Sequence, residues 1–164
     1  MQDLQDIARR VAHLLVERRE TVAVSESSAG GLISAALLSV PGASAYYLGG
    51  AVVYTPKARD ALLGIGARQM AKAGIRSASE PWAALMAKTI RENHGATWGL
   101  SETGATGPAG NRYGDPAGHG CFAIDGPAAR AVTLRTGSAD RLANMRAFAA
   151  AALGLFEDAL DGRP

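Results

Sequence analysis

Hydrophobic and polar positions follow two different periods along the chain. Apolar residues recur every three or four positions over residues 2–19, with charged residues between them, which predicts an amphipathic helix. Residues 21–24 alternate as a strand does, and a second helical pattern follows and ends before Pro41-Gly42. The N-terminal quarter of the chain therefore predicts a helix, a strand and a second helix.

The rest of the chain continues this alternation of strands and helices. A segment at 101–120 interrupts it: six of its twenty residues are glycine and two are proline, so we expect a long loop there. The predicted elements are a buried strand at 51–54, a short helix from Pro56, weak helix at 67–75, a helix from Ser79-Glu80-Pro81 to Gly95, strands at 97–100, 120–125 and 130–135, and a long helix after Ser138.

This order of elements predicts the fold class. Helices separate the first three strands, whereas the last two follow each other as a hairpin, which favours a mixed sheet with helices on both faces. We therefore expect a single α/β domain over residues 1–164, built as a three-layer α/β/α sandwich with a mixed sheet. A chain of 164 residues is long enough to bury such a core without disulfides.

Composition excludes several classes of protein. Seventeen basic and fifteen acidic residues are spread along the chain, and no run of like charge indicates a nucleic-acid or membrane surface. No apolar run has membrane-spanning length, and the N-terminus does not resemble a signal peptide. The single cysteine, Cys121, excludes a disulfide within the chain and has an apolar setting typical of a buried thiol. We expect a cytoplasmic protein.

Three polar segments follow the first three strands, at 25–31, 54–59 and 101–118, and a fourth lies at 138–141. Ligands of open α/β sheets collect beyond the carboxyl ends of the strands, so these segments are the candidate site. The first runs directly from strand to helix, and the free N–H groups of such a helix start suit an anion. The alternative is an ordinary helix cap made by Ser27 or Ser28.

The sequence contains neither the ligand spacing of a metal site nor a familiar catalytic motif. Glu102, Asp115 and His119 lack the spacing of metal ligands, so we expect neither a metal nor a cofactor. The glycine-rich loop lacks the Gly-Lys-Ser/Thr ending of a phosphate-binding loop, and no histidine accompanies a hydrolase elbow. A serine paired with lysine or tyrosine is the remaining common arrangement, and the candidate nucleophiles are Ser27, Ser28, Ser44 and Thr103.

Five short motifs occur in a characteristic order: Ser25-Glu26-Ser27-Ser28-Ala29-Gly30-Gly31, Pro41-Gly42-Ala43-Ser44, Gly50-Ala51-Val52-Val53-Tyr54, Ser79-Glu80-Pro81 and Thr103-Gly104-Ala105-Thr106-Gly107-Pro108. Over roughly residues 5–155 the chain resembles the C-terminal domain family of the competence/damage-inducible protein CinA. That family includes stand-alone nicotinamide-nucleotide amidases.

The resemblance implies an α/β/α fold, a homodimer and hydrolysis of the carboxamide of nicotinamide mononucleotide, which yields nicotinate mononucleotide and ammonia. It implies that Ser44 is the nucleophile and that Tyr54 acts beside a lysine five residues later. It also implies that Thr103, Gly104 and Arg141 line the substrate site. The lysine position is Arg59 in this sequence, and the nearest amine is Lys57.

Arginine keeps its proton at physiological pH, so Arg59 cannot act as a general base, although it can stabilise an oxyanion. Tyr54 would then have to relay the proton. In the long loop, Glu102 directly precedes Thr103. Where the loop leads into the next strand, the family has lysine followed by proline, whereas this sequence has Asn-Arg-Tyr-Gly-Asp-Pro. Arg112 in this segment could contact a phosphate.

The first hypothesis is therefore a nicotinamide-nucleotide amidase with catalytic Ser44, Tyr54 and Arg59. Its small-molecule nucleotide would be bound by Glu26, Ser27, Gly30, Gly31, Thr103, Gly104, Arg112 and Arg141. The alternatives are a divergent relative that binds a nucleotide or metabolite without deamidating it, and an amidase for another small amide.

Overall fold

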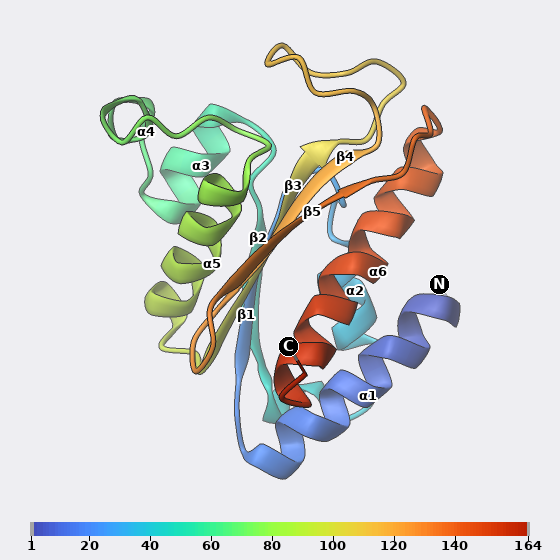
Figure 1. The fold of residues 1–164 in the computed structure, drawn as a ribbon. Helices are drawn as coiled ribbons and strands as arrows, with labels where there is room; N and C mark the ends of the chain where they lie inside the picture. The colour runs from blue at the N-terminus through green and yellow to red at the C-terminus, as the bar shows by residue number, and fades with distance from the viewer. Residues whose placement is uncertain (1, 164) are drawn as a thin grey trace.

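A computed structural model describes residues 2–163, which form a mixed five-stranded sheet with strand order β2-β1-β3-β4-β5 (Figure 1). The strands β2, β1 and β3 run parallel, and β4 and β5 are antiparallel to their neighbours. The prediction of a mixed sheet is confirmed. The strands are β1 (Val22–Glu26), β2 (Tyr47–Val52), β3 (Trp98–Ala105), β4 (His119–Asp125) and β5 (Arg130–Arg135).

Helices cover both faces of this sheet, which confirms the three-layer α/β/α arrangement (Figure 1). One face carries α1 (Gln2–Arg18), α2 (Leu32–Leu38) and α6 (Arg141–Leu160). The other carries α3 (Pro56–Leu63), α4 (Ala67–Lys72) and α5 (Glu80–His94), and a 3-10 turn at Ala43–Ala45 precedes β2. Within residues 2–163 no helix is both long and apolar enough to cross a lipid bilayer.

Side chains alternate between the two faces along β3, and this decides where its polar residues point. Trp98 faces α6, where its ring meets Phe156 edge-on at a centroid distance of 5.6 Å. Ser101 faces α5 instead, and its hydroxyl donates to the carbonyl of Ala83 at 2.6 Å. By the same alternation Glu102 lies on the α6 side and Thr103 on the α5 side.

Two predicted boundaries are wrong. The strand expected to end at residue 100 continues to Ala105, because residues 99–105 pair with β4, so that the loop covers only 106–118. Gly104 belongs to this pairing: a Cβ there would lie 2.5 Å from the carbonyl oxygen of His119. The strand expected at 51–54 is β2, which begins earlier and forms an edge of the sheet, so its side chains alternate in exposure rather than being buried.

Candidate functional site

The carboxyl ends of the three parallel strands meet beneath the loop 106–118, which arches between α4 and the beginning of α6 (Figure 1). A cavity of about 270 Å³ opens there, and we call it the central cavity. Its walls come from the turn after β1, the end of β2, α3, α5 and the end of β3. The residues that line it include Ser27, Tyr54, Arg59, Ser77, Trp82 and Thr103.

Two smaller cavities share walls with the central cavity. One, of about 210 Å³, shares Tyr54 and Gly104 and reaches Arg141; we call it the Arg141 cavity. The other, of about 240 Å³, shares Arg59 and Ser77 and reaches Arg112. Tyr54, Arg59, Thr103, Gly104, Arg112 and Arg141 therefore line one connected region, as the sequence led us to expect.

Ser44, the predicted nucleophile, is not part of this region. It lies exposed in the 3-10 turn at the amino end of β2, whereas Tyr54 follows the carboxyl end of the same strand. Six strand residues separate the two ends, and a strand rises about 3.3 Å per residue, so they are about 20 Å apart. Within one chain the structure does not bring Ser44 together with Tyr54, and this part of the predicted constellation is corrected.

Ser27 takes the place expected of Ser44. It directly follows β1, the central parallel strand, and its half-buried side chain lines the central cavity. Its backbone N–H donates to Oε2 of Glu102 at 3.0 Å. The sequence includes Ser27 among the candidate nucleophiles, and the strand order shows that β1 has parallel neighbours on both sides.

Glu26 stabilises the turn and does not face the cavity. Its fully buried carboxylate accepts hydrogen bonds from the backbone N–H groups of Gly31, Ile33 and Ser34 at 3.0, 3.0 and 2.8 Å. The hydroxyl of Ser34 donates to it as well, at 2.5 Å. The N–H groups expected to bind a ligand anion are thus occupied by the chain's own carboxylate.

The two glycines of this turn serve its geometry. Gly30 and Gly31 have φ angles of +69° and +98°, which side chains disfavour. Neither lines the central cavity. Their expected role as a wall of the ligand site is therefore replaced by a structural one.

Tyr54 and Arg141 connect the ends of three elements. The phenol of Tyr54 is exposed, and its oxygen accepts a hydrogen bond from Nη2 of Arg141 at 3.2 Å. Nη1 of the same arginine donates to the carbonyl of Gly107 at 2.7 Å. Arg141 begins α6, so this contact ties the end of β2 and the loop 106–118 to the start of that helix.

Arg59 presents an uncompensated cation to the central cavity. Its guanidinium carbon lies 4.8 Å from the ring centroid of Trp82, and Nη1 donates to the hydroxyl of Ser77 at 3.2 Å. Within residues 2–163 no carboxylate forms an ion pair with it. Burial lowers the pKa of Arg59 from its usual value, but a guanidinium stays charged in proteins.

Surface contacts hold the loop 106–118 in place. Arg76 forms a bidentate ion pair with Asp115, with nitrogen–oxygen distances of 2.6 and 3.1 Å. Arg112 is exposed and donates to the hydroxyl of Tyr113 at 2.9 Å. Hydrogen bonds with Ser77 and with Arg112 lower the pKa of the Tyr113 phenol. Nε2 of the buried His119 donates to the carbonyl of Ala78 at 3.0 Å.

The sequence assigned no structural role to Glu102, which lies in β3. Its carboxylate is fully buried and accepts from Ser27 N, Ala29 N and the hydroxyl of Ser28. Burial raises the pKa of Glu102 from 4.5 to about 6; the bonds from Ser28, Ala29 and Ser27 oppose that rise, and the charge of Glu26 adds to it.

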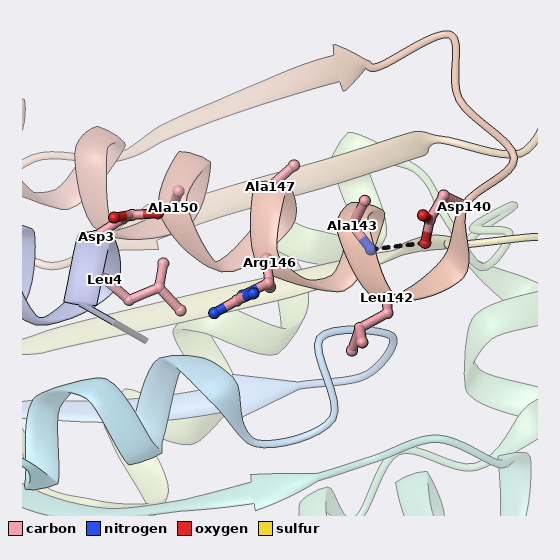
Figure 2. A pocket seen from close by; sticks show the side chains of 8 residues that line it. All are labelled: Asp3, Leu4, Asp140, Leu142, Ala143, Arg146, Ala147 and Ala150. Carbon is pink, nitrogen blue, oxygen red and sulfur yellow. Dashed lines mark hydrogen bonds between the residues drawn. The ribbon is translucent and has the colours of Figure 1, made fainter.

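A larger cavity, of about 510 Å³, lies away from this site between α1 and α6. Leu4 and Arg146 extend into it, and nearby the carboxylate of Asp140 accepts from Ala143 N at 3.0 Å (Figure 2). It contains none of the predicted site residues. Within residues 2–163 no group of three or more histidine, cysteine or acidic residues is placed to hold a metal ion.

Comparison with known proteins identifies the family. Residues 4–160 match the family model of the CinA C-terminal domain. The chain belongs to the CinA C-terminal domain family. It is 38% identical over 148 residues to a CinA-like protein of Desulforapulum autotrophicum, covering 89% of this chain and 34% of that protein. It is 39% identical over 137 residues to a CinA-like protein of Gloeobacter violaceus, covering 83% and 32%.

Solved CinA superfamily structures share the whole fold. A CinA superfamily protein from Klebsiella pneumoniae superposes with a TM-score of 0.88 at 27% identity, covering 97% of this chain and 98% of that one. A competence/damage inducible protein from Agrobacterium tumefaciens superposes with a TM-score of 0.85 at 28% identity, covering 97% and 96%. The chain spans about a third of the length of the two CinA-like relatives, whereas it matches these two structures from end to end.

Proposed function

We propose that this CinA-family chain is an amidohydrolase of a small nucleotide, with nicotinamide mononucleotide as its substrate and Ser27 as its nucleophile. One observation carries the proposal: Ser27, Arg59 and Thr103 line a single cavity at the carboxyl ends of the parallel strands. Acyl transfer uses a nucleophilic hydroxyl and a positive group that stabilises the oxyanion, and Ser27 and Arg59 supply these two groups.

The chemistry follows from these groups. The Ser27 oxygen attacks the carboxamide carbon, a C–O bond forms, and the carbonyl oxygen takes the electron pair of the broken π bond. Arg59 stabilises this oxyanion, a contribution of about 3 kcal/mol at comparable sites. The C–N bond then breaks and ammonia leaves with the proton that Tyr54 relays from Ser27. Water next cleaves the acyl-enzyme ester, which releases the nucleotide carboxylic acid and restores the Ser27 hydroxyl.

The phosphate of the substrate would occupy the Arg141 cavity. Arg141 uses Nη1 and Nη2 on Gly107 and Tyr54, and its fork of five donors leaves others for an anion. Gly104, Gly107 and Gly110 line the same cavity. Arg112 lies at the opposite end of the region and would contact substrate weakly.

The decisive experiment compares two serines. Purified protein is incubated with nicotinamide mononucleotide, ammonia release is measured, and the nucleotide product is identified by mass spectrometry. We expect Ser27→Ala to lower kcat by about 10⁴-fold or more, as removal of a nucleophile does, and Ser44→Ala to retain activity. Activity that survives Ser27→Ala would exclude this serine. A loss confined to Ser44→Ala would indicate that a second copy supplies Ser44, which light scattering for the expected homodimer would test.

A second candidate is binding of a nucleotide without hydrolysis, and Arg59 favours it because the cavity lacks the amine that could accept a proton. Arg59→Lys separates the two. In an amidase, a lysine that stacks on Trp82 and loses its proton adds a base, and we expect kcat to rise about tenfold or more. If neither protein releases ammonia while calorimetry detects nucleotide binding to both, the binding function is the correct one.

A further inference from the structure

Glu102 connects the end of β3 to the turn that carries Ser27. Its Oε2 accepts from the backbone N–H of Ser27 at 3.0 Å and of Ala29 at 2.8 Å, and its Oε1 accepts from the Ser28 hydroxyl. Three donors from three consecutive residues thus converge on one side chain from another strand. No other side chain in residues 2–163 contacts this turn through so many hydrogen bonds to consecutive residues.

The opposite end of the segment is held in the same manner by Glu26. Its carboxylate accepts from Gly31, Ile33 and Ser34, the residues that open α2. Two buried carboxylates therefore fix the chain between β1 and α2 from both ends, and Ser27 projects from the segment that they hold. Of these two carboxylates, Glu102 is the one that accepts from the backbone N–H of Ser27.

Within residues 2–163 no cation forms an ion pair with Glu102. The charge of Glu26 repels it. On α6, Arg141 is engaged by Gly107 and Tyr54, and Arg146 is exposed toward the cavity of Figure 2. On β4, the ring of His119 lies on the opposite face of the sheet, against Ala78, and α2 has no charged residue. The three neutral donors are what stabilise the anion.

We propose that Glu102 is a positioning residue whose ionised carboxylate holds the Ser27–Ala29 turn in the geometry that reaction requires. This inference rests on the proposed function. An ionised carboxylate can accept from all three donors, because each oxygen has two lone pairs and neither carries a proton. A protonated carboxyl group has an O–H of its own, and it can no longer accept all three bonds equally well. The turn then loses part of its support, directly at the nucleophile.

The burial that isolates Glu102 also places this change in an accessible range of pH. Its pKa, raised to about 6, means that the carboxylate is ionised at pH 8 and largely protonated at pH 5. We therefore expect kcat to fall as pH decreases through about 6, with little change in KM, because Ser27 and not the substrate-binding wall is displaced.

The kinetic test uses an isosteric variant and a matched control. Glu102→Gln keeps the volume and an acceptor oxygen for the backbone N–H groups but does not titrate. We expect its kcat at pH 8 to be about tenfold lower than that of the wild type, since bonds to a neutral acceptor are weaker than bonds to a carboxylate. We also expect the acid limb near pH 6 to disappear. Glu92→Gln removes an exposed carboxylate at the end of α5 and should keep the wild-type profile.

An acid limb that persists in Glu102→Gln, or a loss that appears in KM alone, would overturn the proposal. If Glu102 had a purely structural role, Glu102→Gln would be less stable at every pH, but its kcat would still fall as the pH decreases through about 6. Thermal unfolding of each variant at pH 8, measured alongside the kinetics, ensures that only folded protein is compared.

A second measurement does not depend on turnover. The amide resonances of Ser27 and Ala29 in the NMR spectrum should titrate together near pH 6 in the wild type and in Glu92→Gln, and stay constant in Glu102→Gln. If nicotinamide mononucleotide is not hydrolysed, the proposed function fails, yet this titration still decides whether Glu102 controls the turn. Amides that do not titrate in the wild type would overturn the role of Glu102 while leaving the amidase assignment intact.

Discussion

The two sides of the central cavity are built in opposite ways. On one side, the turn from Ser27 to Gly31 rests on two fully buried carboxylates, Glu26 and Glu102, whose partners are backbone N–H groups and serine hydroxyls. On the other side, the loop 106–118 rests on contacts near the surface, above all the ion pair between Arg76 and Asp115. The side that carries Ser27 is supported by buried hydrogen bonds, whereas the loop 106–118 is held by contacts that solvent can weaken.

The pKa values of the two sides are shifted in opposite directions. Burial raises the pKa of Glu102 to about 6, whereas the Arg76 guanidinium lowers the pKa of Asp115 from its ordinary value. Acid therefore favours the folded state through Glu102 and disfavours it through Asp115.

Glu26→Gln should produce the largest loss of stability. The variant keeps the side-chain volume but turns an NH₂ group toward the N–H groups that begin α2, which leaves buried donors without an acceptor. We expect the free energy of unfolding to fall by about 2 to 3 kcal/mol. Urea unfolding followed by circular dichroism measures it. A decrease of less than about 1 kcal/mol would show that the turn from Ser27 to Gly31 is held no more firmly than the loop 106–118.

Glu102 should make the protein less stable as the pH rises. Its pKa is about 6 in the folded protein and 4.5 is its ordinary value, so the folded state binds the proton more tightly. This contribution is fully present below pH 4.5 and is lost as pH rises through 6, a change of about 2 kcal/mol. Urea unfolding of the wild type and of Glu102→Gln from pH 4 to pH 8 isolates it. A difference between the two proteins that is independent of pH would contradict the assignment.

Asp115→Asn should have a smaller effect that depends on salt. We expect a loss of at most about 1 kcal/mol at pH 7, because Arg76 is partly exposed and surface ion pairs contribute little. The lowered pKa of Asp115 means that the wild type loses this contribution only as pH falls below about 4. Urea unfolding measures the free energy of unfolding of both proteins, and we expect the difference between wild type and variant to be smaller at 1 M salt than at low salt. Equal differences at both salt concentrations would argue against an ion pair.

Arg112→Gln should produce the smallest effect, and in KM only. The side chain is exposed and contacts Tyr113, at the far end from the Arg141 cavity. We expect KM for nicotinamide mononucleotide to rise about twofold to fivefold, since an exposed charge contributes less than about 1 kcal/mol. Arg141→Gln is the matched comparison and should raise KM more. The reverse order would place the phosphate at the Arg112 end of the region.

Much of the fold could be predicted from periodicity. The alternation of helices and strands and the final hairpin lead to the mixed sheet, because each element must bury an apolar face against another. The end of β3 could not be found in this way. Gly104 and the polar residues before it indicate a loop, and only their pairing with β4 reveals a strand.

The candidate site was predicted in part. Tyr54 follows β2, and Thr103 lies near the end of β3. Arg59 and Arg141 lie in the first turns of α3 and α6. The direction of the parallel strands places these residues at one edge of the sheet. Trp82 and Ser77 carry no signal in the sequence, because a tryptophan on an amphipathic helix is usually a core residue. Their place in the cavity depends on how α5 and the segment before it lie against β1.

By itself, the sequence determined the order of the elements, the edge of the sheet where chemistry gathers, and the residue types available there. The tertiary structure decided which serine reaches that edge, because β2 carries Ser44 and Tyr54 at opposite ends while β1 delivers Ser27. It also decided that Glu26 and Glu102 are buried supports of the Ser27 turn. The local sequence shows which groups can donate or accept a hydrogen bond. Glu102 lies 75 residues from Ser27 in the chain, and the two residues come within hydrogen-bonding distance only because β1 pairs with β3.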